Sequence, residues 1–296
     1  MTPATVSRPA EAPRASDVRS ASPQASVPAH MLRFDRKTRA LHIVIMTTFL
    51  GLAATGMPLL FSDAPWARAL AMLFFGFRGA GIVHRFFGAT LLAAVIFHVG
   101  DVLWRAFVRG ESGILWGPTS MMPQPKDVAD FFAMVKWFVG LGPRPKIEHF
   151  AYWEKFDYWA VLWGTAIMGL AGLILWFPVV ASRVLPGWMF NVALFVHGAE
   201  ASLAIGFIFA VHFFNAHLRP GKFPMDLVIF TGRVSAHELE HERAAEFERL
   251  RTSGGFDRLA AAAPDRPAIR RGYAIGTIGI SLGLALFVLI LYATLR

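Results

Sequence analysis

The stretch His197–His217, HGAEASLAIGFIFAVHFFNAH, decides the fold, because it is apolar enough to cross a membrane yet carries ionisable side chains. These are His197, Glu200, His212 and His217, and ionisable groups in hydrocarbon are costly enough to be functional candidates. In an α-helix, His197 and His212 lie roughly 22 Å apart along the axis and are rotated by only about 60°. One helix is therefore predicted to offer two ligands on one side, at two depths in the bilayer.

Composition indicates an integral membrane protein. Of the 296 residues, 55% are hydrophobic, which exceeds the average of soluble domains. The net charge of +9 is concentrated in loops, so it indicates membrane topology and not binding to nucleic acid. The chain has no cysteine, which excludes disulfides, iron–sulfur clusters and covalently attached c-type haem in it.

The hydrophobic pattern predicts an all-α fold, an integral membrane bundle of five transmembrane helices. The expected spans are about 41–61, 83–107, 156–177, 188–216 and 272–295. A short amphipathic helix is expected near 128–139. The pattern SAHE from Ser235 predicts a capping box that opens a charged helix, and Gly279 and Gly283 have the GxxxG spacing of packed helices.

The domain organisation follows from these spans. Residues 1–30 are rich in Ala, Pro, Ser and Arg and predict a disordered cytoplasmic tail. Residues 31–232 are expected to form a four-helix membrane domain, 233–271 a charged cytoplasmic segment, and 272–296 the fifth transmembrane helix. Lysine and arginine gather before the first span, between the second and third, and between the fourth and fifth. The positive-inside rule then predicts a cytoplasmic N-terminus and an external C-terminus.

A second pair of histidines repeats the spacing of the first. His84 and His98 on the second span lie roughly 21 Å apart along a helix and about 40° apart in rotation. Because the second and fourth spans run parallel, His84 is expected to face His197 near the outer surface, and His98 to face His212 in the inner half. Each pair offers the two axial imidazoles of a haem b held without covalent attachment, so two haems are expected.

Other residues bear on these two sites. Four arginines are candidates for pairing with haem propionates: Arg78 and Arg85 on the outer side, and Arg105 and Arg219 on the inner side. Packed, hydrogen-bonded histidines are the ordinary structural alternative. A histidine-lined transporter of divalent metal is another, although such a site is expected to include carboxylates, and intramembrane acids are few here.

The inner site has more than one possible histidine. His42, at the cytoplasmic start of the first span, lies at a depth similar to that of His98 and is an alternative partner of His212. A third haem that uses His42 with another histidine also stays open. His217 is rotated about 140° from His212 in an ideal helix and is predicted to lie solvated at the interface. Three further histidines are expected at the surface: His149, His237 and His241.

The motifs RALH, VHRFFG and HGAEA to VHFFNAHLRP resemble the cytochrome b (gamma) subunits of membrane formate dehydrogenases and nickel–iron hydrogenases. The segment EKFDYWAVLWGTAIMGLAGLILWFP fits the same family, and the likeness covers about residues 33–232. The resemblance implies that the haem ligands come from the first, second and fourth spans. In this sequence these are His42, His84, His197 and His212.

His98 departs from that family pattern. It matches instead the fourteen-residue pairing in the cytochrome b of quinol–cytochrome c reductases. The repeated helix geometry favours His98 over His42 as the residue opposite His212.

The resemblance implies quinone as the lipid-soluble partner. Two haems about 20 Å apart would form an electron path across the bilayer. We therefore expect a non-catalytic electron-transfer subunit of a bacterial inner-membrane complex, which exchanges electrons between the quinone pool and redox subunits on the outer face. Five residues are candidates for quinone contact or proton transfer: Glu200, Asp101, Asp157, His217 and Asp226. The alternative is a haem-containing membrane anchor for a soluble enzyme, docked through the charged segment 218–251.

Overall fold

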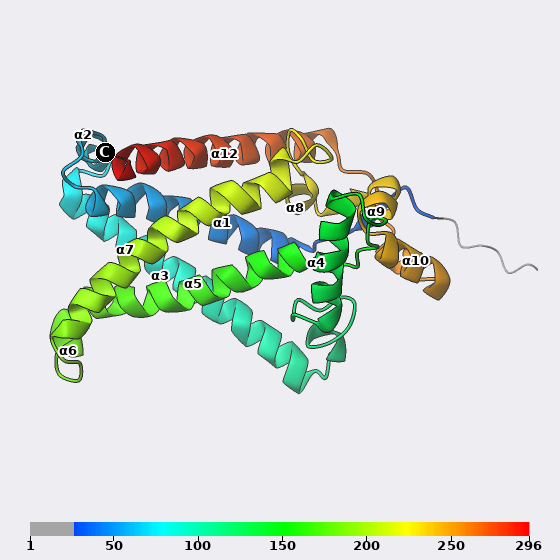
Figure 1. The fold of residues 1–296 in the computed structure, drawn as a ribbon, viewed down its shortest axis with the longest axis horizontal. Helices are drawn as coiled ribbons and strands as arrows, with labels where there is room; N and C mark the ends of the chain where they lie inside the picture. The colour runs from blue at the N-terminus through cyan, green and yellow to red at the C-terminus, as the bar shows by residue number, and fades with distance from the viewer. Residues whose placement is uncertain (1–26, 296) are drawn as a thin grey trace, which may run out of the picture.

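The structure is a computed structural model that describes residues 27–295, so residues 1–26 of the predicted tail lie outside it. Within the described residues, five helices are long and apolar enough to cross a membrane, which confirms the predicted all-α membrane bundle (Figure 1). They are α1 (Arg36–Leu60), α3 with its extension η1 (Gly76–Val108), α5 (Tyr152–Trp176), α7 with η3 and η4 (Trp188–Leu218), and α12 (Arg266–Thr294).

The lengths and outer surfaces of these helices suit a bilayer. The 25 residues of α1 extend about 37 Å, which exceeds the hydrocarbon thickness of about 30 Å. Large apolar side chains point outward along the bundle, among them Phe86, Trp163 and Phe195, which are 65%, 69% and 75% exposed. Apolar surface of this extent marks contact with lipid or another apolar partner.

The spans pack as two pairs with α12 alongside. α1 lies along α3 and α5 lies along α7, while α12 packs on α1 and on the second half of the α7 span (Figure 1). The main core therefore lies between α1, the α7 span and α12, where Leu50, Phe209 and Leu286 are buried. Two short helices, α2 (Pro65–Met72) and α6 (Pro178–Ala181), lie at one end of the bundle.

Glycine allows α12 to approach its neighbours closely. A Cβ at Gly283 would collide with the ring of Phe209, and a Cβ at Gly279 would lie 3.5 Å from Met46 Sδ. The predicted packing role of this GxxxG pair is thus confirmed, and its partners are α1 and η3 (Ile208–His212) of the same chain.

The opposite end of the bundle carries a small folded unit. Strand β1 (His30–Leu32) pairs antiparallel with β2 (Arg233–Ser235), with Met31 opposite Val234. Its elements surround Met31, Leu239 and Phe256. They include α8 (Val228–Thr231), α9 (Ala236–Glu242), α10 (Ala244–Ser253) and α11 (Phe256–Leu259). His30, the last residue of the segment predicted as tail, therefore belongs to a strand.

Two predicted helices, the charged helix after Ser235 and the amphipathic helix near 128–139, differ in detail from those in the structure. Ser235 caps α9 by accepting from the Glu238 N–H, as the SAHE pattern predicts, but the Glu238 carboxylate pairs with Lys222. The charged helix is interrupted at Arg243, between α9 and α10. The amphipathic helix is present as α4 (Pro125–Phe138) and starts three residues earlier than predicted, because Pro125 suits a first helical position.

The prediction that His149 lies at the surface is wrong, whereas His237 and His241 are exposed as expected. Nδ1 of His149 lies 2.6 Å from Nη1 of Arg33 and also contacts the carboxylate of Glu246. Burial would raise the pKa of Glu246, but the hydrogen bond with His149 and the charge of Arg33 outweigh it and lower the pKa to about 2. Through Glu246, α10 is therefore held to Arg33 and His149 by charged hydrogen bonds.

Candidate functional site

Two of the predicted ligands, His84 on α3 and His197 on α7, lie next to each other inside the bundle, with one ring edge-on to the other. Their ring centres are 6.1 Å apart and their planes are inclined by 75°. The structure thus brings together the pair that helix geometry and the family resemblance both predicted. We call this pair the His84–His197 site.

Hydrogen bonds engage the Nδ1 atom of each ring. Thr55 donates its hydroxyl proton to the Gly51 carbonyl at 2.7 Å, so its oxygen accepts from Nδ1 of His84 at 3.1 Å. Nδ1 of His197 donates to the Met168 carbonyl at 3.2 Å. Both rings therefore carry their proton on Nδ1 and keep the Nε2 lone pair available to a metal.

Two glycines make room for these rings. A Cβ at Gly56 on α1 would lie 2.8 Å from Cε1 of His84, and a Cβ at Gly172 on α5 would lie 3.2 Å from Cε1 of His197. A side chain at Gly56 would therefore displace the imidazole of His84. Helices α1 and α5 therefore help to position the imidazoles of His84 and His197.

Three other histidines gather nearer the α9–α10 end of the bundle, in what we call the His42–His212–His217 cluster. His42 lies within electrostatic range of both His212 and His217. Nδ1 of His212 donates to Oδ2 of Asp157 on α5 at 3.1 Å, which leaves its Nε2 free. Within the described chain, Nδ1 of His42 and Nδ1 of His217 are both buried without a hydrogen-bond partner.

The prediction of a solvated His217 is wrong, because its side chain is only 8% exposed and its ring packs against Phe213. The ideal-helix rotation fails here because the span ends in two π-helical turns, η3 and η4 (Phe214–Leu218). Their i→i+5 hydrogen bonds bring residues five apart, such as His212 and His217, closer to one face.

His98 has a different neighbour from the one its spacing suggested. Its Nε2 lies 3.0 Å from the hydroxyl of Tyr158 on α5. Close by, Lys37 pairs with Asp101 at 2.5 Å and lies over the Phe97 ring. Nε2 of His98 is therefore engaged by Tyr158, whereas His42 lies within electrostatic range of His212.

The four arginines considered for propionates differ in availability. Arg78 is exposed, and the guanidinium of Arg85 lies 5.8 Å from the centre of the Trp176 ring. The other two already pair with carboxylates: Arg105 with Glu111 at 2.7 Å, and Arg219 with Glu242 at 2.8 Å. Arg78 and Arg85 are thus the stronger candidates for binding another anion.

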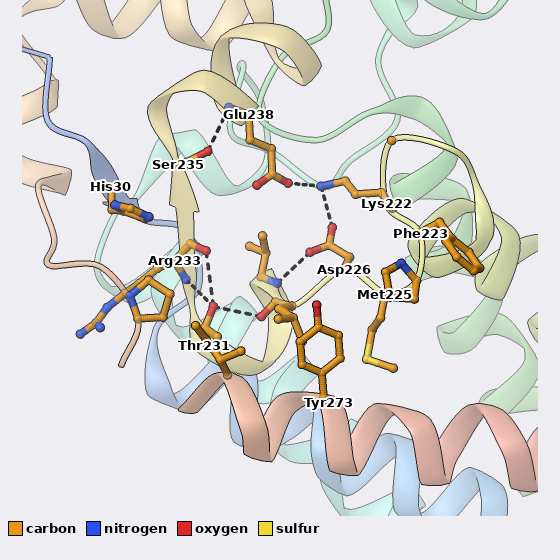
Figure 2. Close-up of a pocket in the computed structure, with 16 residues that line it drawn as sticks. His30, Lys222, Phe223, Met225, Asp226, Thr231, Arg233, Ser235, Glu238 and Tyr273 are labelled. Carbon is orange, nitrogen blue, oxygen red and sulfur yellow. Dashed lines mark hydrogen bonds and ion pairs between the residues drawn. The ribbon is translucent and has the colours of Figure 1, made fainter. Parts of the chain in front are cut away.

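Asp226, a candidate for quinone contact, belongs to a polar pocket outside the helix bundle. Figure 2 shows the ammonium of Lys222 between the carboxylates of Asp226 and Glu238, with Tyr273 of α12 on the opposite wall. Asp226 lies 2.8 Å from Lys222 and accepts the Val228 N–H at 2.7 Å. Burial alone would lower the pKa of Lys222, but the two carboxylates outweigh it and raise the pKa. Asp226 is thus explained by its local contacts.

Glu200 lies one turn after His197, against α5. Its Oε1 is 3.5 Å from the position that a Cβ at Gly164 would take. The side chain is only partly buried, and it lies between the His84–His197 site and the cluster along the helix. Its place is compatible with the predicted role in proton transfer and does not identify that role.

Three residues hydrogen-bond with histidines in ways that the sequence did not predict: Thr55, Tyr158 and Asp157. Thr55 and Tyr158 are isolated polar residues in apolar runs, and spacing alone does not connect either with a histidine. Asp157 was singled out as an intramembrane acid, but only the packing of α5 on α7 reveals its contact with His212.

No protein-family model matches the chain, and no curated protein matches it either. Among residues 27–295, the structure contains no group of three or more His, Cys, Asp or Glu side chains that would hold a metal ion by themselves. The histidine pairs and their hydrogen bonds are therefore the features of the structure that bear on function.

Proposed function

We propose that the chain is a membrane cytochrome b subunit that binds two b-type haems and passes electrons between the quinone pool and a partner redox protein. The observation that carries this proposal is the His84–His197 site, where two imidazoles from different spans have ring centres 6.1 Å apart and both use Nδ1 for a hydrogen bond, which leaves Nε2 available. The motifs that resemble formate dehydrogenase and hydrogenase cytochromes b contain the same residues.

The spacing of the rings suits one metal between them. With metal–nitrogen bonds of about 2.0 Å and about 1.1 Å from each nitrogen to its ring centre, two imidazoles that held one metal would have centres roughly 6.2 Å apart. The observed separation is 6.1 Å. Metal-ligating histidines usually donate their other ring N–H to an acceptor, as both Nδ1 atoms do here.

The second haem is proposed at the His42–His212–His217 cluster, with His212 and His42 as ligands. This choice replaces His98, because Nε2 of His98 contacts the Tyr158 hydroxyl, whereas His42 is within electrostatic range of His212 and its buried Nδ1 has no hydrogen-bond partner within the described residues. It agrees with the ligand set implied by the family resemblance. The hydrogen bond to Asp157 orients His212 with Nε2 free.

The protein residues have defined tasks in this proposal. Each bound haem supplies one-electron redox chemistry. Thr55 and the Met168 carbonyl hold the tautomers of the first pair, Gly56 and Gly172 leave space for its rings, and the apolar spans exclude water. Arg78 and Arg85 are proposed to pair with propionates at the His84–His197 site.

The proposal is tested on the full-length protein purified from membranes in detergent. Haem extraction and reduced-minus-oxidised spectra should give two low-spin haems per chain, and a quinol should reduce both. One haem or none would overturn the two-haem proposal. Two haems that quinol does not reduce would favour the membrane-anchor alternative, and a colourless protein that takes up divalent metal would favour a transporter.

A further inference from the structure

We infer that Asp157 is a positioning residue that lowers the reduction potential of the haem bound by His212 below that of the haem bound by His84 and His197. This inference rests on the proposed function. It concerns the hydrogen bonds behind the ligands, where the two sites differ.

At the His84–His197 site, both imidazoles donate to uncharged acceptors. Nδ1 of His84 donates to the Thr55 hydroxyl oxygen and Nδ1 of His197 to the Met168 carbonyl. These acceptors orient the rings without adding a net charge. The electron-donating strength of the two imidazoles is therefore close to that of ordinary neutral histidine.

At the cluster, the acceptor is a carboxylate. Nδ1 of His212 lies 3.1 Å from Oδ2 of Asp157, whose side chain is 16% exposed. Oδ1 of the same carboxylate is buried without a hydrogen-bond partner within the described residues. The interaction of Asp157 with His212 is thus poorly screened by water.

Two cations that pair with or lie on the first turns of α5 have other carboxylate partners. Lys155, on the same helix, pairs with Asp127 at 2.8 Å. Arg243 pairs with Glu154 at 2.7 Å. Each of these cations has its own carboxylate, and the ion pair that the described structure shows for Asp157 is with His212.

A carboxylate that accepts from the distal nitrogen of a ligating imidazole makes that imidazole a stronger electron donor. A stronger donor and a nearby negative charge both favour ferric over ferrous iron, because the ferric centre has one more positive charge. Second-shell hydrogen bonding and charge are levers by which proteins set haem potentials. The two haems should therefore titrate separately, with the lower potential at His212.

The test is a redox titration of the haem-loaded membrane protein and its Asp157→Asn variant, which keeps the size and an acceptor oxygen but removes the charge. We expect the ferrous-to-ferric ratio at the lower-potential haem to rise at least tenfold at fixed potential, a shift of about 59 mV for one electron. The other haem should be unchanged. Tyr158→Phe is the matched control, because Tyr158 is the next residue on α5 and contacts His98 instead.

Unchanged potentials in Asp157→Asn would overturn the inference while leaving the two-haem proposal intact. If that variant lacks one haem, Asp157→Glu decides: recovery of the haem at its low potential supports the inference, and its absence from both variants or a raised potential overturns it. A wild-type protein without two haems would contradict the proposed function itself, so the two failures are distinguishable.

Discussion

The His84–His197 site and the His42–His212–His217 cluster differ in how completely the protein satisfies their imidazoles. At the first, both Nδ1 atoms have acceptors and the ring centres are 6.1 Å apart. At the second, His212 has an acceptor, while Nδ1 of both His42 and His217 is buried without one among residues 27–295. Buried polar groups without partners are rare in folded proteins, so such a group needs an explanation. The first site is organised by the protein alone, whereas the second is not fully satisfied by the protein.

Backbone geometry underlies this difference. His84 and His197 lie in regular α-helix, where the neighbouring turns fix the direction of each ring. His212 and His217 lie in the two π-helical turns, which break the regular rotation and often mark functional positions.

The largest expected effect is the loss of one haem, and it distinguishes the two sites. His84→Ala should remove one of two haems, because a single imidazole cannot complete the site, and His212→Ala should remove the other. Haem content and redox titration of each purified variant check this. Loss of the same spectral component in both variants would contradict two independent sites.

The next comparison is between His42 and His98. His42→Ala should reduce the haem content from two to one, while His98→Ala should retain both, since His98 contacts Tyr158. The pyridine haemochrome assay measures this directly. If His98→Ala loses a haem and His42→Ala does not, the result would support His98 as the partner of His212, as helix spacing predicted.

A smaller effect is expected from crowding the His84–His197 site. Gly56→Ala places a methyl group 2.8 Å from Cε1 of His84, so it should weaken haem retention at that site about 10- to 100-fold, as changes to supporting residues commonly do. Gly88→Ala is the matched control, because its methyl group would lie 3.8 Å from Leu52, an ordinary contact. Rates of haem transfer to excess apomyoglobin compare the two variants; equal rates would count against the tight fit around His84.

The smallest effect concerns one neutral hydrogen bond. Thr55→Val removes the acceptor beside His84 and should destabilise haem binding by about 0.5–1.5 kcal/mol. The temperature at which the haem absorbance is lost should fall slightly at the His84–His197 site and stay constant at the cluster. A change confined to the cluster would show that Thr55 does not support His84.

Much of this organisation is readable in the sequence. Five apolar runs predict the five spans, and the fifteen-residue gap between His197 and His212 places two histidines at two depths. The facing of His84 and His197 follows from the same periodicity, because both lie in regular helix. GxxxG spacing predicts close packing of the last helix. These features depend on local periodicity and side-chain chemistry, which the sequence by itself determines.

Tertiary structure alone decided the rest. The packing of α5 turns Tyr158 toward His98 and Asp157 toward His212, and two π-helical turns carry His217 into the interior. None of these contacts has a signature in spacing, because they depend on helix rotation and on departures from 3.6 residues per turn. The sequence therefore determined which histidines lie at which depth, while helix packing and backbone irregularity decided which of them meet.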